Sequence, residues 1–488
     1  MQDSLQLKNF LEISYEELEE MNLKAKEAQQ IQDPKELEVR YRLYLQKEKR
    51  VKAVTLCFTD IEGRFHMLDY DKKYLLDSAS NLTFDGSSIR GFTAQHESDL
   101  RLEVDWSSLM WLPSDVFGSG KVVMFADILA RDRSAYISDF RGQLKAYVQE
   151  LKAKKGLKAY SATEIEGFLV EGIGAEQSFD ERIGFKLISI GGYYHSLPLD
   201  KLRRFIDAAA EAQRAMGFKN EKDHPEVAPS QFELNFGYTE VVRACDQIQL
   251  YKLVCRQVAN NLGLTATFLP RPMANINGSG MHTNFSLAKN GKNIFYNNKV
   301  VESSAYQKNG KESLSETAWD FLLKILNHAP EISLALNSSV NSYRRLDPHF
   351  EAPNQIKVSP VDRGSMIRIP AGNEKSARIE IRSVAPDANP YLVLYTILRT
   401  GLEGKKLNIP QGRRERMRFL PGTIHDAIRL FKASDFITKI LGEENKEKYL
   451  FFKEAVADRS PKELGARIKA SEIIYHHEVT NQVLWNNF

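Results

Sequence analysis

The sequence predicts two domains of mixed helix and strand content, of α/β or α+β class, preceded by a helical extension. Three observations carry this prediction. Residues 1–48 have helical periodicity, residues 49–130 alternate as strands do, and the remainder alternates short strands with helices. At 488 residues the chain exceeds a typical single domain, so it can bury a sizeable core.

Residues 1–48 are expected to form a helical N-terminal extension. Ser14-x-x-Glu17 and Asp33-Pro34-x-Glu36 are both helix-start signatures placed ahead of periodic apolar positions. The second helix would bury a stripe made of Leu37, Tyr41, Tyr44 and Leu45. The segment carries no recognisable chemistry, so we interpret it as a packing or docking element.

Residues 49–130 are expected to form a small β-rich domain. The run VKAVTLCFTD alternates, a turn follows at Ile61-Glu62-Gly63, and Arg64–Leu68 returns as the second strand of a hairpin. The loop FDGSSIRGF follows later, and its glycines allow close approach by a ligand or another backbone. Alone, a DGSS sequence is more often a simple turn.

Residues 131–488 are expected to form the larger domain. Apolar residues at helical spacing predict helices over Ser138–Gly156, Leu199–Met216 and Thr239–Leu262. The chain contains no fixed-period repeat and no Pro-rich linker, so the boundary near residue 130 rests on the change of pattern alone.

Composition excludes several classes of protein. The formal net charge of +3 is too small to indicate a nucleic-acid or membrane partner. No apolar run of about 18 residues and no signal-peptide pattern is present, so a cytoplasmic location is expected. Cys57, Cys245 and Cys255 are odd in number and lack a CxxC motif, which argues against a disulfide framework and a thiolate zinc site.

The stretch Lys375–Leu392 is the most informative part of the chain. In an extended strand Arg378, Glu380 and Arg382 share one face, and the two intervening isoleucines point to the other. The pattern indicates a carboxylate held between two guanidinium groups in a cleft, where a metal ion and anions can bind together. The alternative is an exposed strand with paired charges.

Further carboxylates stand at suggestive positions. Glu164 and Glu166 would point the same way from one strand, where two like charges repel unless a cation lies between them. Glu226 and Glu233 are an odd number of residues apart, but the Pro229-Ser230 break allows them to converge. His282 begins an alternating run after a tight NGSG loop. The alternatives are a solvated strand face and a structural histidine.

Six of these residues form an oxygen-rich set with one imidazole and no sulfur, which suits Mg²⁺ or Mn²⁺ better than zinc. They are Glu164, Glu166, Glu226, Glu233, His282 and Glu380. Arg345, Arg363, Arg368 and Arg378 add positive charge of the kind that a transferring phosphoryl group needs, unless they are solvated surface residues. The predicted chemistry is metal-assisted phosphoryl transfer. Neither a GxxxxGK[ST] motif nor a kinase glycine-rich loop is present to hold the nucleotide.

The chain resembles the glutamine synthetase family, and most of all its prokaryotic type I members. The matching blocks occur in the family's order between residues 84 and 392; they are FDGSSIRGF with ESDL, EIEGFLVE, GGYY, PEVAPSQFE, NGSGMHTNFSL, NSYRRLDPHFEAP, DRGSMIRIP and ARIEIRSVAPDANPYL. The resemblance implies an α+β fold. It consists of a small β-grasp-like domain followed by a large catalytic domain with a curved, mainly antiparallel sheet flanked by helices.

The resemblance also implies ligation of glutamate with ammonia, driven by ATP, through γ-glutamyl phosphate. Glu166, Glu226 and Glu233 would hold one divalent ion, and Glu164, His282 and Glu380 the other. These ions would be Mg²⁺ or Mn²⁺. Asn284 stands where many type I members carry a second histidine, so nucleotide contacts can differ here.

The resemblance implies roles for the remaining site residues as well. Arg363 and Arg368 would stabilise the migrating phosphoryl group, and Glu351 would close over the acyl phosphate. Glutamate would be bound by Arg345, Arg382, Asn277 and Gly278, and the nucleotide side would include Glu221, Ser286 and Arg378. Asp85, supported by Ser88 and Tyr193, would attract ammonium and accept its proton.

In the family the loop that bears this aspartate comes from a neighbouring subunit. The resemblance therefore implies a homo-oligomer with active sites between subunits, arranged as a dodecamer of two stacked hexameric rings. Two alternatives remain: a γ-glutamyl ligase for another amine, such as methylamine or a polyamine, and a non-catalytic structural or regulatory relative.

Overall fold

The structure is a computed structural model of the whole chain. It describes residues 13–93, 98–179, 183–195, 200–297, 314–407 and 417–458. Glu97 of the ESDL motif, residues 1–12 of the N-terminal extension and residues 459–488 of the predicted catalytic domain lie outside these ranges.

The two helices predicted at the N-terminus are confirmed as α2 (Tyr15–Ile31) and α3 (Pro34–Lys47). Ser14 caps α2 by accepting a hydrogen bond from the backbone N–H of Glu17, and Asp33 caps α3 through that of Lys35. Of the predicted stripe on α3, Tyr44 is half-buried and the other three side chains are buried.

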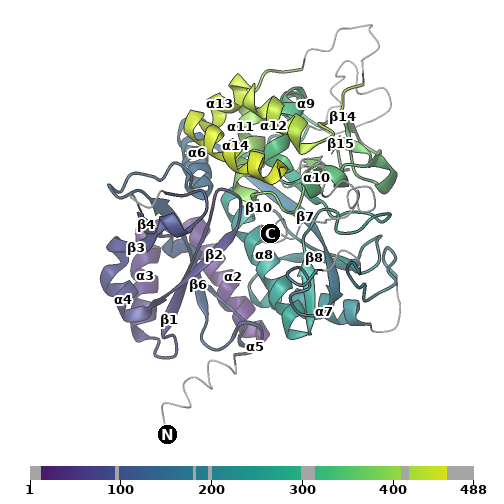
Figure 1. Cartoon of the computed structure of the whole chain (residues 1–488). Coiled ribbons are helices and arrows are strands. Elements are labelled where there is room, and N and C mark those ends of the chain that lie inside the picture. The colour runs from purple at the N-terminus through teal and green to yellow at the C-terminus, as the bar shows by residue number, and fades with distance from the viewer. Residues whose placement is uncertain are drawn as a thin grey trace.

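A small mixed sheet follows these helices (Figure 1). Within the described residues its strand order is β2-β1-β6-β4-β3, with β5 also paired to β6. Its elements are β1 (Ala53–Thr59), β2 (Phe65–Asp71), α4 (Lys72–Ser78), η1 (Ala79–Asn81), β3 (Leu82–Asp85), η2 (Gly86–Ser88), β4 (Asp99–Val104), η4 (Trp106–Ser108), β5 (Met110–Trp111), α5 (Ser114–Phe117) and β6 (Val122–Leu129). The antiparallel pairing of β1 with β2 confirms the predicted hairpin.

A second, larger sheet holds the strands that carry the predicted site. Among the described residues the order is β14-β15-β16-β12-β7-β9-β8, with β10 and β11 paired to β7 and β13 paired to β12. Its strands are β7 (Leu157–Glu171), β8 (Asn220–Pro225), β9 (Gln231–Phe236), β10 (Thr239–Glu240), β11 (Leu264–Thr267), β12 (Met281–Lys289), β13 (Lys292–Asn293), β14 (Gln355–Ser359), β15 (Ser365–Arg368) and β16 (Ile379–Ile381). Apart from the parallel pair β14–β15, the pairings are antiparallel. The predicted α+β class is therefore confirmed.

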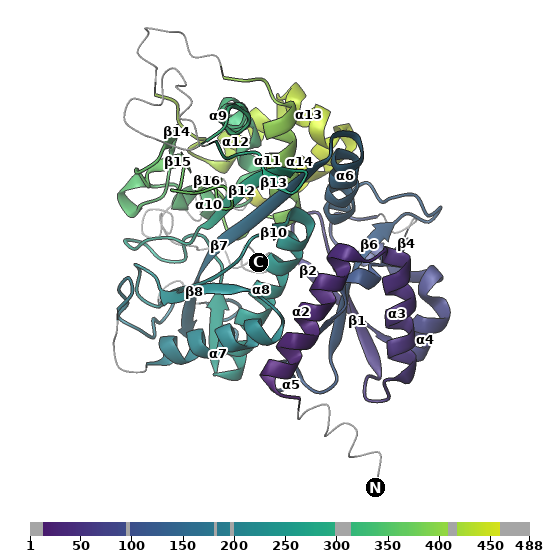
Figure 2. The ribbon, with the colours of Figure 1, turned by 180° about the vertical axis from the view of Figure 1, so that it is seen from behind.

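Helices flank the large sheet, and those in the yellow-green C-terminal part of the chain lie above it (Figures 1 and 2). They are α6 (Phe140–Lys155), α7 (Lys201–Ala215), α8 (Val241–Asn261), α9 (Glu316–Leu336), α10 (Val340–Arg345), η5 (Pro348–Phe350), α11 (Pro390–Glu403), α12 (Ile424–Lys432), α13 (Asp435–Leu441) and α14 (Glu443–Ala457). The helices predicted at α6, α7 and α8 are confirmed to within two residues at each end. Their apolar faces join one continuous core.

A buried charge cluster joins the small sheet to the helices of the large domain. Arg141 of α6 is 2% exposed and pairs with Asp105 at 2.9 Å, with Asp246 of α8 at 2.9 Å and with Asp127 of β6. Lys145 also pairs with Asp105 and Asp127. Because a buried charge is costly without its partners, this cluster fixes how the two parts pack.

The remaining sequence predictions concern thiols and membrane segments. All three cysteines are free and buried, which agrees with the prediction that they form no disulfide. In the parts of the chain that the structure covers, no helix combines the length and apolar character needed to cross a bilayer.

Candidate active site

Strand register gathers the predicted metal-binding side chains at the centre of the large sheet. Glu164 of β7 lies opposite His282 of β12, and Glu166 lies opposite Glu233 of β9. On the far side of β12, Glu380 of β16 lies opposite Asn284. Glu164 and Glu166 share a face because side chains alternate along a strand. The alternative of a solvated strand face is wrong, since Glu166 is buried and Glu164 is half-buried.

Glu226 reaches the same face because the chain bends between β8 and β9. Ser230 in this bend has a φ of +61°, a left-handed backbone conformation that residues other than glycine rarely adopt. Its hydroxyl oxygen accepts hydrogen bonds from the backbone N–H groups of Ile188 at 2.7 Å and Ser189 at 2.9 Å. These bonds hold the strained turn and let both glutamates converge, as the Pro229-Ser230 break predicted.

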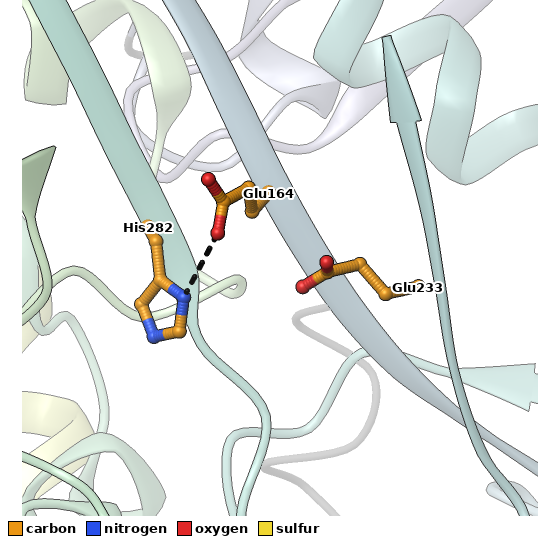
Figure 3. A group of neighbouring side chains, drawn as sticks. All are labelled: Glu164, Glu233 and His282. Atoms are coloured by element: carbon orange, nitrogen blue, oxygen red, sulfur yellow. Dashed lines mark ion pairs between the residues drawn. The ribbon is translucent and has the colours of Figure 1, made fainter. Parts of the chain in front are cut away.

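Two overlapping groups of potential metal ligands result. Donor atoms of Glu164, Glu233 and His282 all lie within 4.8 Å of one another (Figure 3), and so do those of His224, Glu226 and Glu233. In Figure 3 the carboxylates of Glu164 and Glu233 point toward the imidazole from neighbouring strands. Glu233 belongs to both groups, which differs from the expected division into two separate sets of three.

The electrostatics of this cluster favour a bound cation. Burial, reinforced by the charges of Glu166 and Glu233, raises the pKa of Glu226 to about 9. Burial also raises the pKa of Glu233, against the opposing effect of His224. Carboxylates that cannot all ionise together need a positive charge among them. The donor set, rich in oxygen with two imidazoles and no sulfur, fits Mg²⁺ or Mn²⁺.

Glu380 is also at the site, but it is held by arginines rather than by either ligand group. It is fully buried, accepts a hydrogen bond from Arg382 at 2.7 Å and forms an ion pair with Arg368. The Arg-Glu-Arg face predicted for this strand is thus a buried cleft wall, and the alternative of an exposed strand is wrong.

The cluster opens into a cavity of about 260 Å³ lined almost entirely by polar side chains. The four arginines expected near a phosphoryl group line it, so they are not isolated surface residues; they are Arg345, Arg363, Arg368 and Arg378, and Arg382 lines the cavity as well. Arg345 is buried and donates to the backbone carbonyls of Val384 and Arg382 at 3.2 and 3.0 Å. Burial lowers its pKa to about 10, which leaves it cationic near neutral pH.

Glu351 and Asn277 lie together at the rim of this cavity. The Asn277 amide donates to the Glu351 carboxylate at 3.5 Å, and Gly278 lines the same wall. Glu351 has a φ of +59°, and the preceding Phe350 packs its ring 4.2 Å from the guanidinium carbon of Arg271. A non-glycine residue in this conformation at a cavity mouth is typical of functional loops.

A second cavity, also of about 260 Å³, adjoins the first, and Glu164 and Arg378 line both. The residues expected on the nucleotide side, Glu221 and Ser286, line this second cavity. Asn284 bridges the two cavities, because its amide donates to Glu164 at 3.0 Å and its oxygen accepts from Arg378 at 2.8 Å.

The predicted ammonium-site residues are not brought together. Tyr193 lines the first cavity and stacks on Tyr194, with ring centroids 3.8 Å apart. Asp85 and Ser88, by contrast, lie on the small sheet, and neither is among the described residues that line the cavity. The Asp85 carboxylate accepts hydrogen bonds from the hydroxyls of Ser87 at 2.6 Å and Ser88 at 2.5 Å, which lower its pKa.

Sequence reasoning missed His224. It lies near the end of β8, two residues before Glu226, and its ring nitrogens lie 3.6 Å from Glu226 and 3.4 Å from Glu233. The sequence His224-Pro225-Glu226, with a histidine two residues before a glutamate, could have indicated that the two side chains lie close together. A lone histidine carries little weight without the bend at Ser230.

Two family models match the chain. One, described as "Glutamine synthetase, beta-Grasp domain", matches residues 50–131, and the other, "Glutamine synthetase, catalytic domain", matches residues 138–464.

Curated relatives are similar over most of their length. A glutamine synthetase from Methanosarcina mazei is 36% identical over 427 residues, which cover 84% of this chain and 91% of that protein. One from Thermus thermophilus is 34% identical over 420 residues, which cover 81% and 90%.

Solved structures share the fold. A glutamine synthetase from Plasmodium falciparum superposes with a TM-score of 0.76 at 22% identity, covering 88% of this chain and 98% of that one. A structure titled "GmaS/ADP complex-Conformation 1" gives a TM-score of 0.73 at 26% identity, with coverage of 88% and 99%.

Proposed function

The chain belongs to the glutamine synthetase family, and we propose from this premise that its acidic cavity ligates glutamate to ammonia at the expense of ATP. The observation that carries the proposal is the convergence of Glu164, Glu233 and His282 beside a wall of arginines, with the nucleotide-side cavity next to it. The γ-phosphoryl group of ATP passes to the γ-carboxylate of glutamate. Ammonia then displaces phosphate from this acyl phosphate and forms glutamine.

Divalent metal ions and ATP are general requirements of the family. We assign Mg²⁺ or Mn²⁺ to the ligands Glu164, Glu166, Glu226, Glu233, His282 and Glu380, with His224 as a further candidate. Once bound, such ions supply Lewis-acid neutralisation of the reacting carboxylate and phosphate oxygens. Glu380 would exchange its present ion pairs with Arg368 and Arg382 for this role.

The arginines account for binding of the two anionic substrates. Arg345 and Arg382 would pair with the carboxylates of glutamate, and Asn277 with Gly278 would contact its amino-acid end. Arg345 is suited to this because backbone carbonyls already fix its direction. Arg363 and Arg368 would stabilise the charge of the phosphoryl group in transit, which is spread over its oxygens. Glu221, Ser286 and Arg378 would bind the nucleotide.

Exclusion of water matters because the acyl phosphate hydrolyses readily. Glu351 would close the cavity mouth after phosphoryl transfer, since it already lies at the rim with Asn277.

The ammonium site requires a second copy of the chain. Asp85 and Ser88 are exposed on the small sheet, while Tyr193 lies in the cavity. We therefore propose that the Asp85 loop of one subunit completes the cavity of its neighbour in a homo-oligomer, built as two stacked hexameric rings. Asp85 would attract ammonium and accept its proton, because only free ammonia is a nucleophile. We also propose a cytoplasmic location for this activity.

Phosphate release by the purified protein tests the proposal. With ATP, glutamate and Mg²⁺ present, we expect release with ammonia that exceeds release with methylamine or putrescine by at least about tenfold, because the site is built for the smallest amine. Glu226→Gln should lose the activity, and Glu171→Gln, an exposed glutamate on the same sheet, should retain it. Release only with an alkylamine would identify a different γ-glutamyl ligase, and none with any amine a non-catalytic relative.

A further inference from the structure

A separate cavity of about 120 Å³ lies where helix α2 meets the small sheet and helix α8. We name it the α2 pocket. In Figure 2 helix α2 crosses between the small sheet and helices α7 and α8. Its walls come from α2, the segment Ser107–Met110, the turn after α7, the residues around β10, and α8. None of its lining residues lines the proposed active-site cavity.

Three cationic side chains line this pocket: Lys26 of α2, Lys219 after α7, and Arg243 of α8. Lys26 donates a hydrogen bond to the carbonyl of Gly217 at 2.6 Å and lies 4.8 Å from the ring centroid of Phe218. Burial, with repulsion from Arg243 and Lys219, lowers the pKa of Lys26 to about 7. Burial likewise lowers the pKa of Arg243. Lys26 and Arg243 are therefore poorly solvated, and Lys219 at the exposed rim adds to the positive charge around them.

The carboxylates nearby do not neutralise this charge. Asp246 lines the pocket but forms an ion pair with Arg141 at 2.9 Å, and Glu240 pairs with Lys158 at 3.0 Å. Glu27 also lines the pocket, but its side chain is exposed to solvent. Within the described ranges, the guanidinium group of Arg243 has no hydrogen-bond or ion-pair partner. The half-buried guanidinium group of Arg243 is therefore available to pair with an anion that enters the pocket.

The other walls define what kind of anion fits. Leu109, Met110 and Leu250 are buried and give the pocket an apolar floor. Gln247 presents a buried side-chain oxygen that accepts no hydrogen bond from any residue the structure describes. The volume approaches that of an engineered cavity of about 150 Å³ that holds benzene, so a short chain or one ring can enter.

We propose that the α2 pocket binds a small organic anion. Its carboxylate or phosphate head would lie between Lys26 and Arg243, and its apolar body would pack against Leu109, Met110 and Leu250. A hydroxyl or amide group on the ligand would donate to Gln247. No residue that lines the α2 pocket also lines the proposed active-site cavity, so the bound molecule would be an effector rather than a substrate.

The position of the pocket supports this role. Helix α2 precedes residue 50, where the match to the β-grasp family model begins. Tyr238 lines both the α2 pocket and the nucleotide-side cavity, and its ring packs edge-on against Tyr160 of β7 with centroids 5.9 Å apart. One side chain thus separates a bound effector from the nucleotide side.

Direct binding tests the proposal without use of the ligase reaction, so its failure would leave the proposed function untouched. The probes are 4-fluorobenzoate and 4-fluorophenyl phosphate, whose ¹⁹F line widths report binding to the full-length protein. We expect the ¹⁹F signal of at least one of the two anions to broaden when the protein is added. The signal of the neutral methyl ester of the benzoate should remain sharp. The anion that binds more tightly identifies the preferred head group, carboxylate or phosphate.

Variants locate the binding. Lys26→Met and Arg243→Gln should each weaken binding at least about tenfold, the effect of losing one charge-assisted hydrogen bond. Lys24→Met, on the exposed face of the same helix, is the matched control and should bind as wild type. If Arg243→Gln fails to fold, Lys219→Gln at the exposed rim replaces it. Absence of binding by both anions, equal broadening by the ester, or unchanged binding in the folded variants would overturn the proposal.

Discussion

Replacing Glu226 by glutamine should stabilise the metal-free protein, although it removes a proposed metal ligand. Glu226 lies near Glu166 and Glu233 in a buried site, and this environment raises its pKa from 4.5 to about 9. The folded protein therefore holds this proton more tightly than the unfolded chain does. The stability that this proton contributes is fully present at pH values below the pKa of Glu226 in the unfolded chain. It is lost as the pH rises toward the pKa of Glu226 in the folded protein. Glutamine carries no charge to repel its neighbours.

The size of the effect follows from the pKa difference. At about pH 7.5 the carboxylate is about three pH units above its unfolded pKa, and each unit corresponds to about 1.4 kcal/mol, so the upper bound is about 4 kcal/mol. Because the neighbouring carboxylates share protons, we expect Glu226→Gln to gain about 1–4 kcal/mol there. At about pH 4.5 the gain should vanish, since wild-type Glu226 is then protonated in the folded protein.

Urea unfolding in the presence of a chelator measures this gain at both pH values. Glu171→Gln is the matched control, and as an exposed residue it should change stability by less than about 0.5 kcal/mol. Added Mg²⁺ or Mn²⁺ should stabilise wild type more than Glu226→Gln. The reasoning is refuted if the metal-free variant is no more stable than wild type at the higher pH, or if metal stabilises both proteins equally.

Four other substitutions test separate parts of the account. Asn284→Ala removes the bridge between Glu164 and Arg378 and should raise the KM for ATP by about 10–100-fold, whereas a KM within about twofold of wild type would contradict this role. Arg141→Met leaves three buried carboxylates without their guanidinium and should cost about 3–5 kcal/mol in urea unfolding; a loss no larger than that of exposed Arg429→Met would argue against a structural cluster. Glu351→Ala should release more phosphate than glutamine, because water then reaches the acyl phosphate, and an unchanged ratio would exclude closure by Glu351. Asp85→Ala should raise the KM for ammonium, and an unchanged KM would remove Asp85 from the ammonium site.

The strand-borne part of the site could be predicted from the sequence because alternation is a local rule. Glu164 and Glu166 had to share a face, and so did Arg378, Glu380 and Arg382, wherever the strands paired. Which strands pair is a non-local property. The opposition of Glu164 to His282 depends on a β7–β12 register between residues far apart in the chain.

Other features depend on conformations that the sequence does not specify. The convergence of Glu226, His224 and Glu233 rests on a left-handed serine, a conformation that propensity disfavours and that hydrogen bonds to a distant loop maintain. The α2 pocket could not be predicted at all. Lys26 and Arg243 belong to charged faces of two separate helices, and only the packing of α2 beside α8 places them in one cavity.

The fate of one oxygen atom tests the central claim most directly. When the γ-carboxylate of glutamate is labelled with ¹⁸O and supplied with ATP and ammonia, the account predicts one ¹⁸O in each phosphate released, in proportion to the glutamine formed. The labelled oxygen bridges carbon and phosphorus in the acyl phosphate and leaves with phosphorus when ammonia attacks the carbon. Glutamine formed together with unlabelled phosphate would contradict phosphoryl transfer to glutamate in this cavity.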